Sequence, residues 1–428
     1  DLATGCARWT SRVSAEGRTA IVVEPWEAGE PPNPRLYFGD HLGRVYAMDA
    51  LSGRVLWQQR VDDHPNSTIT GSVALHDGVL YVPVSSLEVT TAADPNYACC
   101  TFRGSVVALD AATGAIRWRH YTVERPPSPQ GRTRVGTPIL GPSGAPVWTS
   151  PTIDVRRGVL YHGSGENYSS PADGNSDAVF AVDLATGKRV WVRQITRHDA
   201  WNGACMLKDH PNCPAENGPD FDIAASPLLI DLGDGREVII VGSKSGEVLA
   251  LDPGRRGRVL WKTRVGRGGV QGGVHFGMAA EGSRIFVPIV DLDDGNDGKV
   301  YDTPGFAGLH ALDARTGRFL WRALAPRDVC EGRRFCDPGI SAAVTAIPGV
   351  VFAGALDGRL RAYESATGRV LWETDTLLPV AAVNGEIARG GSIGGPGPVV
   401  AKGHVIVNSG YGIYSHMAGN ALLVYAPD

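Results

Sequence analysis

The chain has 428 residues and carries 41 Lys and Arg against 45 Asp and Glu. The resulting net charge of -4 gives no reason to expect nucleic acid or an anionic membrane as a partner, so a small or neutral molecule is expected. No apolar run approaches the roughly 18 residues of a membrane-spanning helix, and no signal peptide opens the chain, which starts without Met. Length alone is compatible with two or three domains or with one large all-β unit.

Six similar segments recur about every 50 to 70 residues along the chain. Each has a short apolar strand, an acidic residue with Thr-Gly or a similar pair, and a second strand that ends in Trp, as in 104-GSVVALDAATGAIRW-118. The Trp follows the acidic residue by eight positions in five segments and by nine in one. This pattern predicts a β-hairpin with a Gly-bearing turn in each of the segments 43–57, 104–118, 178–191, 246–261, 308–321 and 358–372.

Further strand-turn pairs lie between these hairpins, for example in 73-VALHDGVLYVPV-84, 347-IPGVVFAGAL-356 and 399-VVAKGHVIVNSG-410. Four strands per unit at this period predict a β-propeller, in which four-stranded antiparallel blades pack face to face around an axis. We therefore expect an all-β fold in which residues 1–428 form a single propeller domain. The Trp residues of the repeat, together with Trp9, are expected to dock one blade on the next.

The two ends of the chain look like halves of the same repeat. The segment 1-DLATGCARW-9 is typical of the second half of a hairpin, and 420-NALLVYAPD-428 of a first half that stops at the matching Asp. One split blade and six intact blades give about seven blades, closed by pairing of the two ends. The alternative is that an N-terminal portion with the rest of another blade is missing.

The chain has seven cysteines. The polar stretches 205-CMLKDHPNC-213 and 330-CEGRRFC-336 each place two of them where a short disulfide would pin a loop; the alternative is that these thiols are reduced. If they pair, an exported protein is expected. Cys99 and Cys100 are neighbours, about 3.8 Å apart at Cα, whereas a disulfide favours roughly 4.4–6.8 Å. The pair is therefore either two small buried thiols or a strained bond with a purpose. Cys6 has no obvious partner.

The repeat Ala-x-Asp-x-x-Thr-Gly-x-x-x-Trp resembles the blade motif of the pyrroloquinoline quinone (PQQ) dehydrogenases over essentially the whole chain. The resemblance implies an eight-bladed propeller whose quinone lies on the axis between a tryptophan and a vicinal disulfide. Cys99 and Cys100 in 97-YACCTFRG-104 match that disulfide, and Arg103 matches an arginine that binds the quinone in the alcohol dehydrogenases of the family.

Other positions match the cofactor site of this family. In 147-VWTSPTIDVRRGVLYHGSGENYSSP-171, Trp148 corresponds to the tryptophan floor, and Glu166 stands where the family has an Asn that binds Ca²⁺. The segment 84-VSSLE-88 resembles a loop with the other calcium glutamate, which nominates Glu88 as a ligand of Ca²⁺ near the quinone. Lys244 matches a Lys or Arg near the quinone carbonyls. For each acid the alternative is that it is only a solvated loop residue. For Lys244 the alternative is that it is an exposed lysine in a turn.

The segment 198-HDAWNGAC-205 stands where alcohol dehydrogenases of the family read His-Asp-x-Trp-Asp. Their catalytic aspartate is the last residue, and this chain has Asn202 there. An amide cannot take a proton from an alcohol, so Asp199 becomes the candidate base. The alternative is that Asp199 only holds the loop through hydrogen bonds.

Four segments, 4-TGCARW-9, 198-HDAWNGAC-205, 389-RGGSIGGPGPVV-400 and 407-VNSGYG-412, look like those of polyvinyl alcohol dehydrogenases. The resemblance implies a periplasmic or secreted enzyme that oxidises secondary alcohols with PQQ and Ca²⁺ and passes electrons to a cytochrome c. The family's haem domain is expected to be lost by truncation or supplied by a separate protein, since the chain has no Cys-x-x-Cys-His.

Three alternatives stay open. A non-catalytic propeller scaffold of the outer-membrane assembly type would have similar blades but no cofactor sandwich. A quinoprotein that oxidises sugars or primary alcohols would use the same site with a different substrate. The replacement at Asn202 is also compatible with a degenerate, inactive member.

Overall fold

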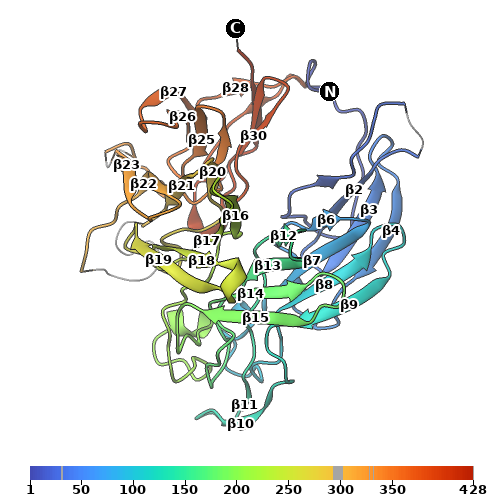
Figure 1. The fold of residues 1–428 in the computed structure, drawn as a ribbon, viewed down its shortest axis with the longest axis vertical. Helices are drawn as coiled ribbons and strands as arrows, with labels where there is room; N and C mark the ends of the chain where they lie inside the picture. Colours follow the sequence, from blue (N-terminus) through green and yellow to red (C-terminus); the bar gives the residue numbers. More distant parts are fainter. Residues whose placement is uncertain (30–31, 293–301, 327, 331, 428) are drawn as a thin grey trace. The chain divides into compact units, whose positions relative to one another are not determined.

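The computed structural model describes residues 1–29, 32–292, 302–326, 328–330 and 332–427 (Figure 1). Nearly all regular structure in them is β-strand, and seven sheets of three to five antiparallel strands are the blades of a β-propeller. This confirms the predicted fold class. No helix in the described part of the chain is long and apolar enough to cross a membrane.

Two compact units are distinguished, residues 1–223 and 224–428, and each is described by itself. The first unit has three blades. They comprise β1 (Val22–Val23), β2 (Arg35–Gly39), β3 (Arg44–Asp49) and β4 (Val55–Arg60); β5 (Ser67–Thr68), β6 (Ala74–His76), β7 (Val79–Ser86), β8 (Ser105–Asp110) and β9 (Ile116–Tyr121); and β12 (Thr152–Asp154), β13 (Val159–Gly163), β14 (Ala178–Asp183) and β15 (Arg189–Gln194). Outside them lie the hairpin β10 (Ser128–Arg132) and β11 (Pro138–Gly141), helix α1 (Glu88–Thr91) and the 3₁₀ turn η1 (Gly203–Met206).

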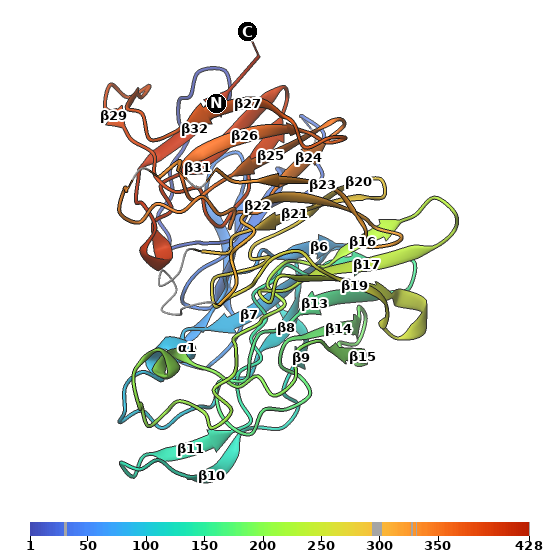
Figure 2. The same cartoon turned by 90° about the vertical axis from the view of Figure 1, so that its left-hand side faces the viewer.

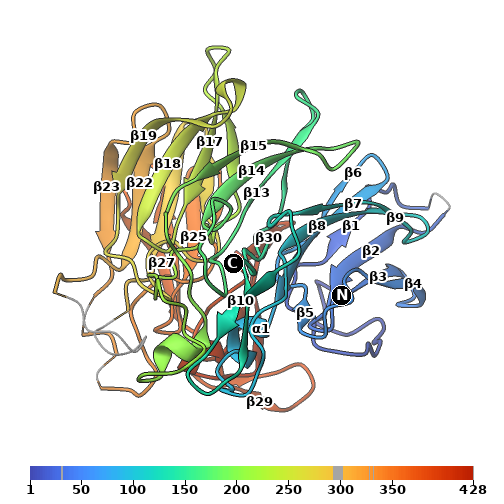
Figure 3. The same ribbon diagram turned by 90° about the horizontal axis from the view of Figure 1, so that it is seen from below.

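The second unit has four blades (Figure 3). They comprise β16 (Leu228–Asp231), β17 (Glu237–Gly242), β18 (Glu247–Asp252) and β19 (Arg258–Arg264); β20 (Ala279–Glu281), β21 (Arg284–Ile289), β22 (Gly308–Asp313) and β23 (Phe319–Leu324); β24 (Thr345–Ile347), β25 (Val350–Gly354), β26 (Arg359–Glu364) and β27 (Val370–Asp375); and β30 (Val399–Ala401), β31 (His404–Ser409) and β32 (Ala421–Tyr425). The unit also has the hairpin β28 (Val380–Ala381) and β29 (Ile387–Ala388) and the 3₁₀ turns η2 (Pro253–Arg255) and η3 (Ile413–Ser415).

The hydrophobic core lies between consecutive sheets. Inner strands such as β8 and β18 are rich in Val, Leu and Ala and are buried on both faces, whereas the outer strands β4 and β19 alternate or are exposed. In the first unit, Tyr37 and Val45 of one blade pack against Leu80 and Val107 of the next. The face-to-face stacking predicted from the repeat is therefore what buries these strands.

In four of the six repeats, the Trp at the end of the hairpin docks on the turn of the next blade. The indole N–H of Trp57 donates to the carbonyl of Ala111 at 3.2 Å, and the ring lies on Gly114, where a Cβ would come within 2.8 Å of it. Gly114 also has φ +75°, so only glycine suits this position on both counts. The same arrangement recurs for Trp9, Trp118, Trp261 and Trp321. The docking role predicted for these residues is confirmed.

The acidic residue of the repeat closes the hairpin turn. In the second blade, the Oδ1 atom of Asp110 accepts hydrogen bonds from the backbone N–H groups of Ala112 and Thr113, both at 3.0 Å. This is the local bond by which an Asp favours a turn over a continued strand. The repeat thus encodes both the turn, through Asp, and the contact between blades, through Gly and Trp.

The N-terminal end differs from its prediction as a hairpin strand. Residues 1–21 contain no strand, and the carboxylate of Asp1 instead closes a turn by accepting the N–H groups of Ala3 and Thr4. Trp9 still docks on its blade, through a 3.1 Å bond to the carbonyl of Ala50. The tryptophan contact therefore does not require the pairing of a fourth strand.

Two buried histidines in the first unit make its stability depend on pH. His162 stacks on Phe180 at 4.9 Å, and burial lowers its pKa to about 4 from an ordinary value of 6.5. The pKa of the adjacent His120 is lowered to about 3, by burial and then by His162. Between these values and 6.5 the unfolded chain binds more protons than the folded one, so stability is full above pH 6.5 and is lost as the pH falls.

We therefore expect the free energy of unfolding of His162→Phe to fall less between pH 6.5 and pH 4 than that of the wild type. The wild-type free energy of unfolding should fall by about 3 kcal/mol for His162 alone between pH 6.5 and pH 4. Urea unfolding at both pH values measures it. An equal decline in the variant would contradict the assignment.

Candidate functional site

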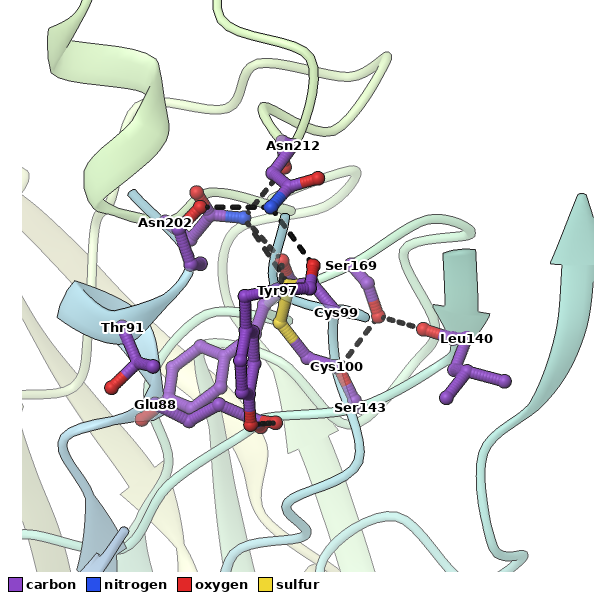
Figure 4. The surroundings of a disulfide bond; sticks show 12 residues. Glu88, Thr91, Tyr97, Cys99, Cys100, Leu140, Ser143, Ser169, Asn202 and Asn212 are labelled. Atoms are coloured by element: carbon purple, nitrogen blue, oxygen red, sulfur yellow. Dashed lines mark hydrogen bonds between the residues drawn. A yellow bond between two sulfur atoms is a disulfide. The ribbon is translucent and has the colours of Figure 1, made fainter. Parts of the chain in front are cut away.

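Cys99 and Cys100 form a disulfide that is almost fully buried in the first unit. The cysteine segment runs beside the hairpin β10–β11: the N–H of Leu140 donates to the carbonyl of Cys99 at 2.8 Å, and the N–H of Cys100 donates to the carbonyl of Leu140 at 3.1 Å. Figure 4 shows the disulfide and the side chains around it. The remaining cysteines pair as predicted, Cys205 with Cys213 and Cys330 with Cys336. Cys6 is exposed and free.

Glu88, the first residue of α1, is completely buried beneath this segment. Its carboxylate accepts hydrogen bonds from the Tyr97 hydroxyl at 2.8 Å and from the backbone N–H groups of Thr101 and Phe102, both at 2.9 Å. Burial raises the pKa of Glu88, but hydrogen bonds from His64 and from these N–H groups outweigh it, so the pKa is lowered. Glu88 is thus an ionised anchor for the residues that follow the two cysteines.

Arg103 and Trp148 lie in loops of the same unit. The Arg103 guanidinium stacks on Tyr121, 3.7 Å from the ring centre, and donates to the carbonyl of Glu124 at 3.0 Å. Trp148 lies half-buried in the loop between β11 and β12. Lys244 belongs to the second unit, in the turn between β17 and β18, and only 6% of it is exposed, so it is not the exposed turn lysine of the alternative.

Three buried carboxylates form a candidate cation site in the first unit. Oxygens of Glu166, Asp220 and Asp222 lie within 4.8 Å of one another, and none of the three residues is more than 3% exposed. The backbone N–H of Glu166 donates to Asp222 Oδ1 at 3.1 Å, which ties the two loops together. Carboxylate oxygens at this spacing are the ligands that Ca²⁺ prefers, so the residues suit such an ion.

Asp199 is buried beside this cluster and holds its loop. Its two carboxylate oxygens accept the backbone N–H groups of Asp220 at 3.2 Å and Phe221 at 2.8 Å. Burial, reinforced by the charge of Asp222, raises the pKa of Asp199 despite these hydrogen bonds. A fifth acid, Asp177, is fully buried next to it, and burial together with the charge of Asp199 raises its pKa well above the ordinary value.

Asn202 lies on the other side of the same loop, against the cysteines. Its Nδ2 donates to the carbonyls of Tyr168 at 2.8 Å and Asn212 at 2.9 Å, and lies 3.9 Å from the sulfur of Cys99. Its Oδ1 accepts the N–H of Ala204 and caps η1. Both the donor and the acceptor atoms of the Asn202 amide therefore bind backbone groups.

Asp177, Asp220 and Asp222 were not predicted from the sequence. The last two stand in 219-PDFDI-223, and this Asp-x-Asp pair was a usable signal, because closely spaced carboxylates are typical ligands of Ca²⁺. Nothing local in the sequence marks Asp177, which becomes conspicuous only through its burial beside Asp199.

Comparison with known proteins places the chain in a family. The model of the glucose/ethanol/alcohol dehydrogenase β-propeller domain matches residues 87–272, and the model of the outer membrane protein assembly factor BamB matches residues 244–413. A quinohemoprotein alcohol dehydrogenase of Pseudomonas putida has a similar fold, with a TM-score of 0.60 at 19% identity over 92% of this chain and 66% of that one.

Sequence similarity is much higher to two polyvinyl alcohol dehydrogenases. The chain is 40% identical to the protein of a Pseudomonas species over 99% of its own length, and 39% identical to the protein of Sphingopyxis sp. strain 113P3 over 97%. It spans 67% and 64% of the lengths of these relatives. On this similarity, the chain belongs to the PQQ-dependent alcohol dehydrogenases, a family of oxidoreductases, and within it to the group of the polyvinyl alcohol dehydrogenases.

Proposed function

We propose that the protein oxidises secondary alcohols of the polyvinyl alcohol type to ketones with PQQ and Ca²⁺, and passes the electrons to a cytochrome c. The observation that carries the proposal is the buried carboxylate cluster of Glu166, Asp220 and Asp222, in a chain 40% identical to a polyvinyl alcohol dehydrogenase. Bound PQQ would supply the hydride acceptor. The protein would supply binding, orientation and polarisation.

The cation would be held by Glu166 with Asp220 and Asp222, and would act as a Lewis acid near the reacting carbonyl. Glu88 was nominated as a second ligand; its hydrogen bonds to Thr101 and Phe102 favour a role in placing Cys99–Cys100 against the quinone. The disulfide and Trp148 would cover the two faces of the ring. Arg103 and Lys244 would stabilise negative charge on its oxygens.

Asp199 would take the hydroxyl proton of the alcohol. Its burial and its raised pKa support a carboxylate poised as a base, and its bonds to Asp220 and Phe221 would fix its orientation. These bonds equally support the alternative that Asp199 only holds the loop. The loss of kcat on replacement of Asp199 therefore distinguishes the two roles.

The three disulfides support a periplasmic or secreted location, since disulfides persist in oxidising compartments. A cytochrome c is proposed as the electron acceptor on family grounds alone.

Reconstitution tests the proposal as a whole. The full chain is mixed with PQQ and Ca²⁺, quinone absorbance reports binding, and dye reduction is followed with secondary alcohols, polyvinyl alcohol and glucose. We expect binding and activity with the first two substrates. Failure to bind PQQ would leave a propeller scaffold, and activity with glucose alone would make the protein a sugar dehydrogenase.

Asn202→Asp introduces the aspartate that the family has at this position. We expect it to destabilise the fold rather than to restore a catalytic base. A carboxylate cannot donate to the carbonyls of Tyr168 and Asn212, and each lost buried bond costs about 1–3 kcal/mol. Urea unfolding and dye reduction should therefore both decline. A rise in kcat would show that position 202 can still act as the base.

A further inference from the structure

A disulfide-closed loop reaches the segment that carries the vicinal cysteines. Cys205 and Cys213 close the loop, and Asn212 lies just inside it, 7% exposed. Its Nδ2 has two N–H donors and lies within hydrogen-bond distance of three backbone carbonyls of the preceding segment, those of Ala92 at 3.1 Å, Asp94 at 2.8 Å and Tyr97 at 3.1 Å. One amide thus holds three carbonyls ahead of Cys99, and Figure 4 shows its bond to Tyr97.

Asn202, three residues before Cys205, links this loop to the surroundings of the cysteines. Asn202 donates to the carbonyl of Asn212 at 2.9 Å and to that of Tyr168 at 2.8 Å, and lies 3.9 Å from Cys99 Sγ. The two asparagines therefore form one chain of hydrogen bonds from the segment before Cys99 to the carbonyl of Tyr168, which lies 3.9 Å from Cys100 Sγ. The Oδ1 of Asn212 is buried and accepts no hydrogen bond in the described structure, so the side chain acts through its donor alone.

The hairpin β10–β11 closes the arrangement from a third side. Thr137 Oγ1 donates to the carbonyl of Pro95 at 2.8 Å, and the guanidinium of Arg134 donates to the carbonyl of Asp209 in the loop. Figure 2 shows α1 and this hairpin at the same end of the first unit. The segment before the cysteines is therefore held by the hairpin and by the loop at once.

We propose that Asn212, in the loop closed by Cys205–Cys213, is a positioning residue that fixes the Cys99–Cys100 face of the cofactor site and thereby sets the affinity for PQQ. This inference rests on the proposed function. A rigid face binds a flat ring without an ordering cost at the moment of binding, so loosening the face weakens the affinity. Chemistry on bound cofactor does not involve this amide, so turnover at saturating PQQ is largely retained.

The test compares Asn212→Ala with Asn33→Ala. Asn33 also donates from its Nδ2, to Asp49 at 2.9 Å in the first blade, and serves as the matched control. We expect Asn212→Ala to raise the Kd for PQQ about tenfold, with kcat at saturating cofactor within about twofold of wild type. Amide hydrogen exchange in the cofactor-free protein should speed up at residues 97–102. The control should change neither quantity.

The double variant Cys205→Ser/Cys213→Ser should show the same two effects, and it guards against a misfolded Asn212→Ala. Unchanged PQQ affinity and unchanged exchange in both variants would overturn the inference, as would a loss of kcat at unchanged Kd. If wild type binds no PQQ, the proposed function fails. Exchange at residues 97–102 then still decides whether the loop holds the cysteines.

Discussion

Asp199→Asn is expected to lower kcat by about 10²- to 10⁴-fold, the range by which general acid–base catalysis accelerates proton transfer. The amide keeps the shape of the side chain but cannot take the hydroxyl proton. Dye reduction at saturating PQQ, Ca²⁺ and secondary alcohol measures the effect. The loss should appear in kcat, with affinity for the cation and for PQQ close to that of wild type.

The measurement must separate catalysis from loop support, because both Asp199 oxygens accept backbone N–H groups, those of Asp220 and Phe221. Asn offers only one acceptor, so part of that support is lost. Asp183→Asn is the matched control: Asp183 accepts the N–H groups of Ala185 and Thr186 in an exposed turn. If cation affinity falls as steeply as kcat, Asp199 supports the loop and the base lies elsewhere; unchanged kcat excludes it as the base.

The blades could be predicted because their determinants are local. Asp110, Gly114 and Trp118 stand within one hairpin, where Asp110 closes the turn, Gly114 accepts an indole ring and Trp118 reaches the next blade. The paired cysteines 205–213 and 330–336 were predictable for the same reason, since short loops bring their ends together. Residues 1–9 were wrongly expected to form a strand, because strand formation depends on a partner that the sequence does not identify.

The site could be predicted only in part, because it is assembled from distant segments. Glu166 stands in a recognisable loop, whereas Asp222, which binds its N–H, lies 56 positions further on. Burial decides the chemistry of Asp177 and Asp199, and burial is a property of the fold. For Asn202 the residue type was informative, but its hydrogen-bond partners, Tyr168 and Asn212, could not be read from the sequence.

Asp222→Asn is expected to weaken binding of Ca²⁺ about 100-fold, since calcium affinity follows the number of charged ligands. The substitution removes one of three carboxylates in the cluster with Glu166 and Asp220. The Asn carbonyl oxygen can still accept the N–H of Glu166, so the loop contact is kept while the charge is lost. The effect therefore reports charge rather than misfolding.

Urea unfolding of the cofactor-free protein, with and without Ca²⁺, measures this change without any turnover. At a Ca²⁺ concentration about 100 times the wild-type Kd, binding adds about 2.7 kcal/mol to the free energy of unfolding, and after a 100-fold loss of affinity only about 0.4 kcal/mol remains. Asp231→Asn is the control, since Asp231 accepts the backbone N–H of Gly233 in the second unit. Equal stabilisation of Asp222→Asn and wild type would place the calcium ion away from Glu166, Asp220 and Asp222.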